Sequence, residues 1–169
     1  MEYIKDFDKW NIEKKNVDMK SINKELFFYS REIWWCSTGV NIGVEADGKN
    51  DNFERPMLII KKFNSDMIWV IPLTTKEKQN KYYYKLEYDI IKSWAIVSQL
   101  KTISTKRLLR KIGSISELDF KEIIVTLQDT LKIESPLTGA FSEAEATNID
   151  SIDNKVNKVK TEIIYENIL

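Results

Sequence analysis

Short runs of β-branched and aromatic residues, separated by brief polar or glycine-containing breaks, dominate the chain between residues 31 and 116. Runs of this length and composition predict β-strands. The connections are too short to hold crossover helices, so neighbouring strands must pair antiparallel. We therefore expect a mainly β, α+β protein built on an antiparallel barrel or a strongly bent sheet. Five runs are clear and a weaker sixth follows: Glu32–Cys36, Pro56–Ile60, Met67–Ile71, Tyr82–Tyr84, Trp94–Val97 and Leu100–Ile103.

Helical patterns flank these strands. Ile4, Phe7 and Trp10 recur at three-residue spacing within residues 3–17, which predicts a short amphipathic helix. After the last strand, the segment Ser114–Glu117 offers a helix cap. Apolar residues then follow at spacings of three and four, which predicts a helix that covers one face of the sheet. These residues are Leu118, Phe120, Ile123, Ile124, Leu127 and Leu131.

Residues 136–169 form an acidic tail. They contain six acidic residues and three lysines, so their net charge is −3. Residues 1–135 carry a net charge of +3, and the chain is neutral overall. Apolar residues spaced three and four apart predict a helix with a narrow seam, which either docks on its own domain or pairs with another chain. We expect three parts: a helical extension over 1–30, the β domain over 31–135, and the tail over 136–169.

The sequence contains no histidine and one cysteine, Cys36. This composition excludes Cys/His zinc sites, Ser-His-Asp and Cys-His triads, and a disulfide within the chain. We expect no metal and no cofactor. No apolar run approaches the roughly 18 residues that would span a membrane, and no signal sequence follows Met1, so we expect a soluble cytoplasmic protein.

Arg55 is the most distinctive basic residue. It follows a glycine-bounded loop and directly precedes Pro56 and an apolar strand, so its planar guanidinium is positioned at a junction between loop and strand. Such a group suits a phosphate, although it can instead pair with Glu54 or Asp47 to hold the loop. The other basic residues considered for an anion site are Lys61, Lys62, Lys76, Lys78, Lys101, Lys106, Arg107, Arg110 and Lys111.

Two further segments carry polar side chains beside predicted strands. Thr74 and Thr75 end an apolar strand and precede Lys76, so their hydroxyl groups can donate to phosphate oxygens. The segment from Ser98 to Arg107 alternates polar and apolar positions, which indicates a strand with one face toward a groove or toward water.

The order and spacing of these pieces resemble the MazF/PemK family of toxins from type II toxin–antitoxin modules, over about residues 31–131. Four segments carry the resemblance: Arg31–Trp35, Gly43–Gly48, Arg55–Ile60 with Pro72–Thr74, and Ser98–Ile103 followed by Arg107–Leu108 and Lys111–Gly113. The family's glycine after the opening arginine is absent here, and its glutamate and arginine in the fourth segment are Ser98 and Lys101. The loop from Lys49 to Glu54 is longer than in short members of the family.

The resemblance implies an SH3-like antiparallel β-barrel with a covering helix, in a homodimer. It implies a metal-independent endoribonuclease that cleaves single-stranded RNA, such as mRNA, through attack by the 2′-OH and thereby inhibits growth. The family's catalytic arginine and threonine fall on Arg55 and Thr74, with Thr75 as the alternative registration. The expected partners are a cognate antitoxin and, through the antitoxin complex, operator DNA. Residues expected to contact substrate are Glu45, Asp47, Thr75, Lys76, Gln99 and Lys101.

Two other functions fit the same fold. A CcdB-like toxin binds and poisons DNA gyrase without cutting nucleic acid, and a catalytically inactive member contributes only DNA binding within the toxin–antitoxin complex. The presence of Arg55 and Thr74 favours the nuclease.

Overall fold

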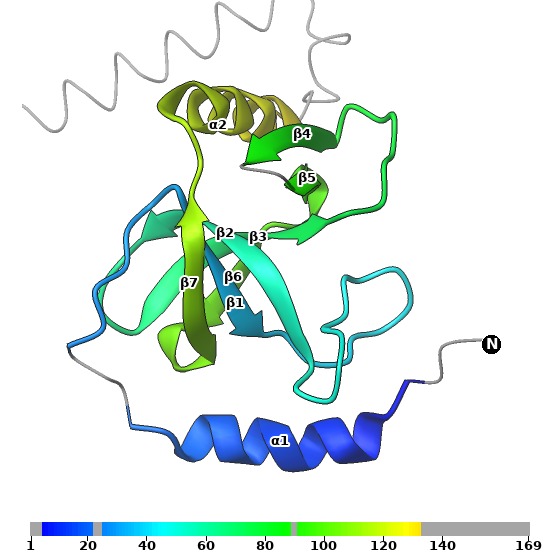
Figure 1. Ribbon diagram of the computed structural model, residues 1–169, viewed down its shortest axis with the longest axis vertical. Helices are drawn as coiled ribbons and strands as arrows, with labels where there is room; N and C mark the ends of the chain where they lie inside the picture. Colours follow the sequence, from blue (N-terminus) through cyan, green and yellow to red (C-terminus); the bar gives the residue numbers. More distant parts are fainter. Residues whose placement is uncertain (1–4, 22–24, 89–90, 133–169) are drawn as a thin grey trace, which may run out of the picture. The chain divides into compact units, whose positions relative to one another are not determined.

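The computed structural model describes residues 5–21, 25–88 and 91–132 (Figure 1). Its seven strands all pair antiparallel, in the order β4-β5-β3-β2-β1-β7, with β6 paired to β3 beside β5. The strands are β1 (Glu32–Ser37), β2 (Glu54–Lys62), β3 (Met67–Thr74), β4 (Tyr83–Tyr88), β5 (Ile91–Ile96), β6 (Lys101–Ser104) and β7 (Leu108–Ser114). The predicted antiparallel α+β class and all six predicted strands are therefore confirmed. The sheet does not close, because β4 and β7 end the path without pairing with each other.

Strand β3 organises the sheet. One edge of β3 pairs with β2, while the other edge pairs with β6 along its first half and with β5 at its end. The single-turn helices η1 (Val97–Gln99) and η2 (Thr105–Arg107) separate β5, β6 and β7. This arrangement brings β2, β3 and β6 side by side, although β6 is far from β2 in the sequence.

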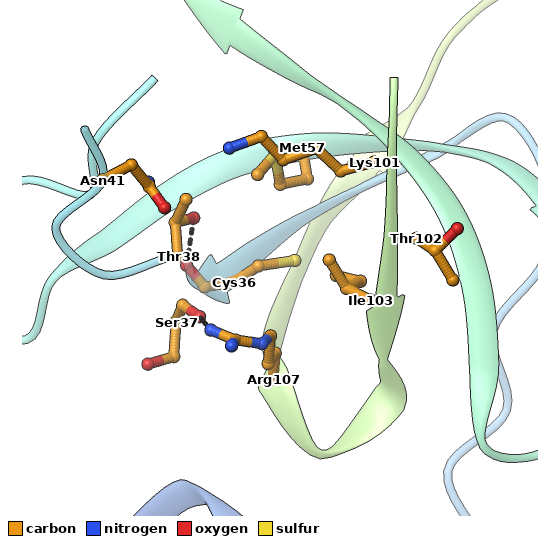
Figure 2. A pocket seen from close by; sticks show the side chains of 9 residues that line it. All are labelled: Cys36, Ser37, Thr38, Asn41, Met57, Lys101, Thr102, Ile103 and Arg107. Carbon is orange, nitrogen blue, oxygen red and sulfur yellow. Dashed lines mark hydrogen bonds between the residues drawn. The ribbon is translucent and has the colours of Figure 1, made fainter. Parts of the chain in front are cut away.

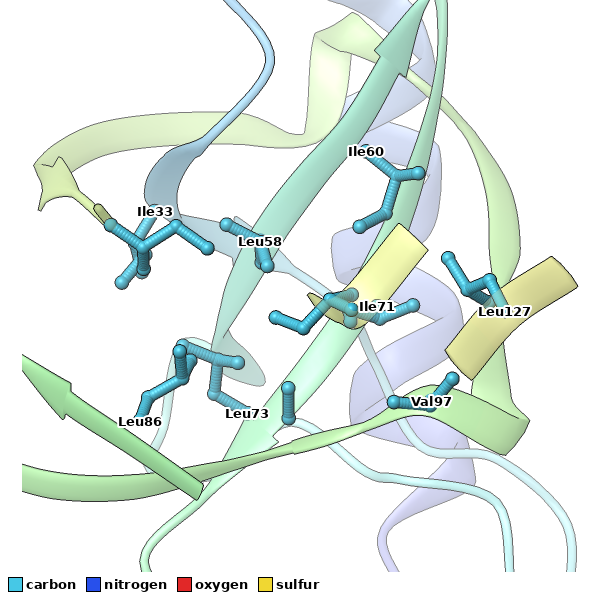
Figure 3. Close-up of a cluster of buried hydrophobic side chains, with 11 residues drawn as sticks. Ile33, Leu58, Ile60, Ile71, Leu73, Leu86, Val97 and Leu127 are labelled. Carbon is cyan, nitrogen blue, oxygen red and sulfur yellow. The ribbon is translucent and has the colours of Figure 1, made fainter. Parts of the chain in front are cut away.

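Apolar side chains fill both faces of the central strands. One core contains Ile33, Leu58, Ile71 and Leu73 together with residues of β4, β5 and helix α2 (Figure 3). Alternate residues of β1, β2 and β3 form a second core on the other face, together with Phe28, which precedes β1, and Leu108, which begins β7. The strand residues of this core are Trp34, Cys36, Met57, Ile59, Ile68 and Val70. Because successive side chains of a strand point to opposite faces, burial on both faces explains why these strands read as continuous apolar runs.

Helix α2 (Glu117–Leu131) covers the first core, as its apolar spacing predicts, through Ile123 and Leu127. Ser116 supplies the N-cap, since its hydroxyl oxygen accepts the Asp119 N–H at 3.0 Å. Tyr84 of β4 donates its hydroxyl group to Glu122 at 2.8 Å and to Asp119 at 3.0 Å.

Helix α1 (Phe7–Met19) confirms the predicted N-terminal helix, with Asp6 as its N-cap. Its packing face differs from the predicted one. Trp10 and Val17, seven residues apart, are buried, whereas Phe7 is half exposed. Ile4 and the predicted tail helix over 136–169 lie outside the described residues. Neither described helix has the length and apolar character needed to cross a membrane.

Candidate functional site

Arg55 and Thr74 lie level with each other on neighbouring strands. In the β2–β3 pair, Met57 is opposite Pro72, so the positions two residues further toward this end of the strands are 55 and 74. Alternate residues of a strand share a face, and cross-strand partners share it too. The side chains of Arg55 and Thr74 therefore belong to the Met57 face of the sheet.

Backbone carbonyl groups hold the Arg55 guanidinium. Its Nε donates to the carbonyl oxygen of Asp47, and its Nη1 donates to the carbonyl oxygen of Leu73 at 2.9 Å. Of the two carboxylate partners considered from the sequence, Glu54 bonds instead to Arg110, at 2.7 and 2.9 Å. Arg55 thus ties the loop before β2 to the end of β3.

The loop from Gly39 to Gly48 is closed by its own polar groups. The Gly48 N–H donates to the Gly39 carbonyl at 2.7 Å, and the Asn41 N–H donates to the Asp47 carboxylate at 2.6 Å. Lys5 forms an ion pair with the same carboxylate at 3.0 Å. Asp47 therefore uses its side chain to close the loop and its carbonyl oxygen to hold Arg55.

Three other predicted residues meet on this loop. The Gln99 side chain accepts the Ala46 N–H at 2.7 Å and donates to the Val44 carbonyl at 3.0 Å. Lys101 lies 3.4 Å from the carboxylate of Glu45, which is half exposed. Gln99, Lys101 and Glu45 are thus joined through one loop to Asp47, the residue that holds Arg55.

The end of β3 carries the remaining predicted residues. The Thr74 hydroxyl oxygen accepts the Lys76 N–H at 3.2 Å, and its own proton is available to donate. Thr75 and Lys76 follow in exposed positions. The structure therefore brings the hydroxyl group of Thr74 and the guanidinium of Arg55 to one end of the β2–β3 pair, with two further polar residues at the rim.

A pocket of about 360 Å³ opens beside this end of the strands. Arg55, Thr74 and Thr75 line it together with Lys49 and Asn50. Its apolar walls come from the opposite face, the face of the first core: Ile33, Trp35, Pro56, Leu73 and Ile112. Arg55 and Thr74 therefore border this pocket from the end of their strands. Sequence reasoning did not single out Trp35, Lys49 or Asn50 as site residues. For Trp35, the only signal in the sequence is that it lies two residues after Ile33 in β1, so that both side chains point to the same face of the sheet.

Two reactive side chains are unsuited to chemistry here. Burial raises the pKa of the Cys36 thiol far above its ordinary value, and this side chain is fully enclosed. Burial, together with hydrogen bonds to Glu122 and Asp119, raises the pKa of the Tyr84 hydroxyl group. Tyr84 therefore anchors β4 to α2. Among the described residues no group of three His, Cys, Asp or Glu side chains is positioned to hold a metal ion.

Comparison with known proteins identifies the family. The family described as PemK-like, MazF-like toxin of type II toxin-antitoxin system matches residues 29–131, which include both α2 and every strand. No protein with curated annotation matches the chain significantly in sequence.

Solved structures of similar fold cover the same part of the chain. MazF (Form-I) from Deinococcus radiodurans is 12% identical with a TM-score of 0.52, and the match covers 64% of this chain and 100% of that one. An endoribonuclease from Mycobacterial species is 14% identical with a TM-score of 0.50, covering 67% and 100%. Another, in complex with its cognate antitoxin, is 13% identical with a TM-score of 0.50, covering 65% and 100%. With the family pattern matched over more than half of its length, the chain belongs to the PemK-like, MazF-like toxins of type II toxin–antitoxin systems.

Proposed function

We propose that this toxin is a metal-independent endoribonuclease that cleaves single-stranded RNA at the Arg55–Thr74 site and thereby inhibits translation and growth. The observation that carries the proposal is the pairing of a carbonyl-held guanidinium with a hydroxyl group at one end of the β2–β3 pair. The names of two solved structures of similar fold, both endoribonucleases, support the same activity.

The chemistry requires little from the protein beyond position and charge. RNA supplies its own nucleophile, the 2′-OH, which attacks the adjacent phosphorus in line with the departing 5′-oxygen. Arg55 binds the nonbridging oxygens, and Thr74 donates a hydrogen bond to the same phosphate, so that both stabilise the charge that develops in the transition state. The products are a 2′,3′-cyclic phosphate, or a 3′-phosphate after hydrolysis, and a 5′-OH.

The proton transfers need a group other than Arg55, because a guanidinium with a pKa above about 12 is a poor base. Glu45, Asp47, a backbone group and water are the candidates. The Asp47 carboxylate already accepts from Asn41 and Lys5. Glu45 is more accessible, since its side chain is 53% exposed beside Lys101. These contacts favour Glu45 over Asp47 as a participant.

The partners follow from the family. We propose a homodimer, a cognate antitoxin that inhibits the toxin, and operator DNA bound through the toxin–antitoxin complex, all in the cytoplasm. One solved structure of similar fold is in complex with its cognate antitoxin, which supports the antitoxin as a partner.

The test is cleavage of single-stranded RNA in the presence of EDTA. The wild-type chain is expected to cut RNA and to leave an oligonucleotide with 2′-deoxyribose at the scissile position intact. Arg55→Ala and Thr74→Ala are each expected to lower kcat about 10²–10³-fold, the typical effect of removing one group that stabilises transition-state charge.

Matched controls lie on the outer face of α2. Lys121→Ala removes an exposed cation, and Thr126→Ala removes a hydroxyl group that bonds within the helix to the Glu122 carbonyl. Both controls are expected to retain the wild-type rate. Unchanged cleavage by both site variants would show that the site is elsewhere, and intact RNA with inhibited gyrase would replace the nuclease with a binding toxin.

A further inference from the structure

A second polar pocket, of about 160 Å³, lies on the Met57 face of the sheet (Figure 2). We call it the Arg107 pocket. Two cations reach it from different elements, Arg107 from η2 and Lys101 from β6. No carboxylate lines it. The remaining lining residues are Cys36, Ser37, Thr38, Asn41, Met57, Thr102 and Ile103.

Arg107 is a partly enclosed cation without a carboxylate partner among the described residues. It donates one N–H to the Ser37 carbonyl at 2.8 Å, and its guanidinium carbon lies 5.7 Å from the centre of the Trp10 ring. A guanidinium carries five N–H donors, so this single hydrogen bond leaves most of its capacity unused. Burial lowers the pKa of Arg107, because desolvation disfavours its charged form.

Burying a positive side chain without a negative partner costs free energy, and a bound anion removes much of that cost. The polar residues on the opposite wall of the pocket supply no negative charge to Arg107. Thr38 donates its hydroxyl group to the Cys36 carbonyl at 3.1 Å, and Thr102 accepts from the Trp69 indole at 2.9 Å. Lys101 adds a second cation, which forms an ion pair with the half-exposed Glu45 at 3.4 Å. The pocket is therefore suited to a small anion.

The pocket adjoins the Arg55–Thr74 site. Met57, which lines the pocket, follows Arg55 by two residues in β2, so the two side chains share a face. Asn41, which also lines it, donates its N–H to the Asp47 carboxylate, while the Asp47 carbonyl accepts from Arg55. The loop thus reaches the pocket through Asn41 and Arg55 through Asp47, and these two loop residues are hydrogen-bonded to each other. An extended polyanion that follows this loop can therefore meet both cations.

We propose that the Arg107 pocket binds a second phosphate of the RNA strand whose scissile phosphate lies at Arg55. The inference rests on the proposed nuclease function and extends it from one phosphate to two. The planar guanidinium fork of Arg107 donates two parallel hydrogen bonds to the two nonbridging oxygens of the second phosphate. The ammonium group of Lys101 adds a second positive charge near that phosphate. This second contact fixes the direction of the strand across the end of β2 and β3.

The test measures binding of a fully 2′-O-methylated RNA oligonucleotide, which cannot be cleaved, by fluorescence anisotropy at several KCl concentrations. Each phosphate contact on a single strand contributes about −0.7 to the slope of log K against log[salt]. Arg107→Gln is expected to make the slope about 0.7 shallower and to weaken binding at low salt roughly tenfold or more, as for loss of a charged hydrogen bond.

Three further variants sharpen the result. Lys101→Gln is expected to make the slope shallower as well, whereas Arg107→Lys keeps the charge and hence the slope but weakens binding through loss of the fork. Lys121→Gln, which removes an exposed cation on α2, is the matched control and is expected to behave as wild type. Thermal unfolding verifies that each variant folds, and if Arg107→Gln does not fold, Lys101→Gln decides.

The outcomes separate the two proposals. RNA that is cleaved by the wild type but bound with an unchanged slope by Arg107→Gln overturns the second phosphate site alone. A slope that becomes shallower only in Lys101→Gln removes Arg107 from the site. RNA that is bound with the expected slopes but never cleaved overturns the nuclease and keeps the second site. An oligonucleotide that does not bind at all overturns both.

Discussion

Two buried carboxylates show how single residues of this sheet satisfy one another. Glu32 of β1 bonds to Lys111 at 2.5 Å and accepts from the Trp34 indole at 2.9 Å, while Glu54 of β2 forms the bidentate pair with Arg110. Both basic partners belong to β7. A buried carboxylate is tolerated only when its oxygens are bonded, so β7 supports the residues around Arg55 as well as completing the sheet.

Glu32 makes the free energy of unfolding depend on pH. Burial by itself raises the pKa of this carboxyl group, but hydrogen bonds from Lys111, Trp34 and the Tyr29 N–H outweigh burial and lower it below 4.5. A depressed pKa in the folded state adds stability that is present above the unfolded-state value and is lost as the pH falls through the folded-state value. We expect Glu32→Gln to lower the Tm at pH 7, by an amount that shrinks below about pH 4.5.

Thermal unfolding monitored by circular dichroism between pH 3 and 7 measures this effect. Glu117→Gln, which changes an exposed carboxylate of α2, serves as the control and is expected to follow the wild-type pH dependence. A Tm difference for Glu32→Gln that stays constant over the whole range would contradict the assignment.

Gly39 is required for two reasons at once. Its φ of +87° disfavours any residue with a side chain, and a Cβ atom there would lie 2.1 Å from the Trp10 ring. Gly43 also has a positive φ, of +57°, but a Cβ atom there would meet nothing within 4 Å. We expect Gly43→Ala to cost about 1 kcal/mol from backbone strain, and Gly39→Ala to cost about 1–3 kcal/mol more from overlap.

A double-mutant cycle with Trp10→Ala isolates the overlap. In the Trp10→Ala background the two glycine substitutions are expected to cost the same in urea unfolding, since the ring that distinguishes them is gone. If Gly39→Ala retains its extra cost there, the ring is not the cause.

At the scale of elements, α1 is attached to the loop that holds Arg55. Trp10 packs with Val40, which lies within the loop, and with Phe53, which follows it, and the Trp10 and Phe53 rings are 5.5 Å apart. Lys5 adds a hydrogen bond to the Asn41 carbonyl at 2.7 Å beside its ion pair with Asp47. The family pattern begins at residue 29. Helix α1 is thus an addition to that pattern which braces the residues next to the site.

Removing this brace is expected to loosen the loop before it unfolds the sheet. Trp10→Ala should cost about 3 kcal/mol, increase hydrogen exchange at the Asn41 and Gly48 amides, and lower RNA cleavage. Both amides bond within the loop. Ile12→Ala, at an exposed position of the same helix, is the control. Faster exchange across the β2–β3 pair with no selective change in the loop would mean that Trp10 stabilises the sheet generally.

Helix α2 depends on a single cap. The Ser116 hydroxyl group bonds to the Asp119 N–H and carboxylate, at 3.0 and 2.5 Å. Ser116→Ala is expected to cost about 1 kcal/mol in urea unfolding. Ser114, the other serine of the predicted cap segment, is the last residue of β7 and is exposed. Ser114→Ala should therefore be close to neutral, and equal costs at the two serines would contradict the cap assignment.

At the scale of the whole molecule, the neutral net charge conceals an uneven distribution. Residues 1–135 carry +3 and residues 136–169 carry −3. Electrostatic attraction between a polyanion and a basic surface acts over a Debye length, about 10 Å at 0.1 M salt. A covalently attached segment of opposite charge is therefore expected to weaken that attraction.

Replacing residues 137–169 with a neutral Gly/Ser segment of equal length is expected to raise kcat/KM for RNA several-fold at low salt. The advantage should disappear near 0.5 M KCl, where such interactions are screened. A scrambled tail of unchanged charge is the control and should cleave at the wild-type rate. A gain that persists at high salt would instead indicate that the tail covers the site directly.

Local patterns in this sequence were sufficient to predict six of the seven strands, both described helices and the antiparallel class, because alternation, apolar spacing and short connections depend on neighbouring residues alone. They did not predict β7 (Leu108–Ser114), whose polar and charged residues interrupt the apolar pattern. Order and spacing of motifs also identified Arg55 and Thr74 as the pair to test. The tertiary structure decided the rest. The register of β2 and β3 places Arg55 level with Thr74, and the pairing of β1 with its neighbours brings Glu54 to Arg110 instead of Arg55. Tertiary packing places Trp10 against Gly39 and encloses Arg107 beside Lys101. The strand order leaves the sheet open. These contacts join residues far apart in the chain, and no local pattern specifies which distant group will meet a given side chain.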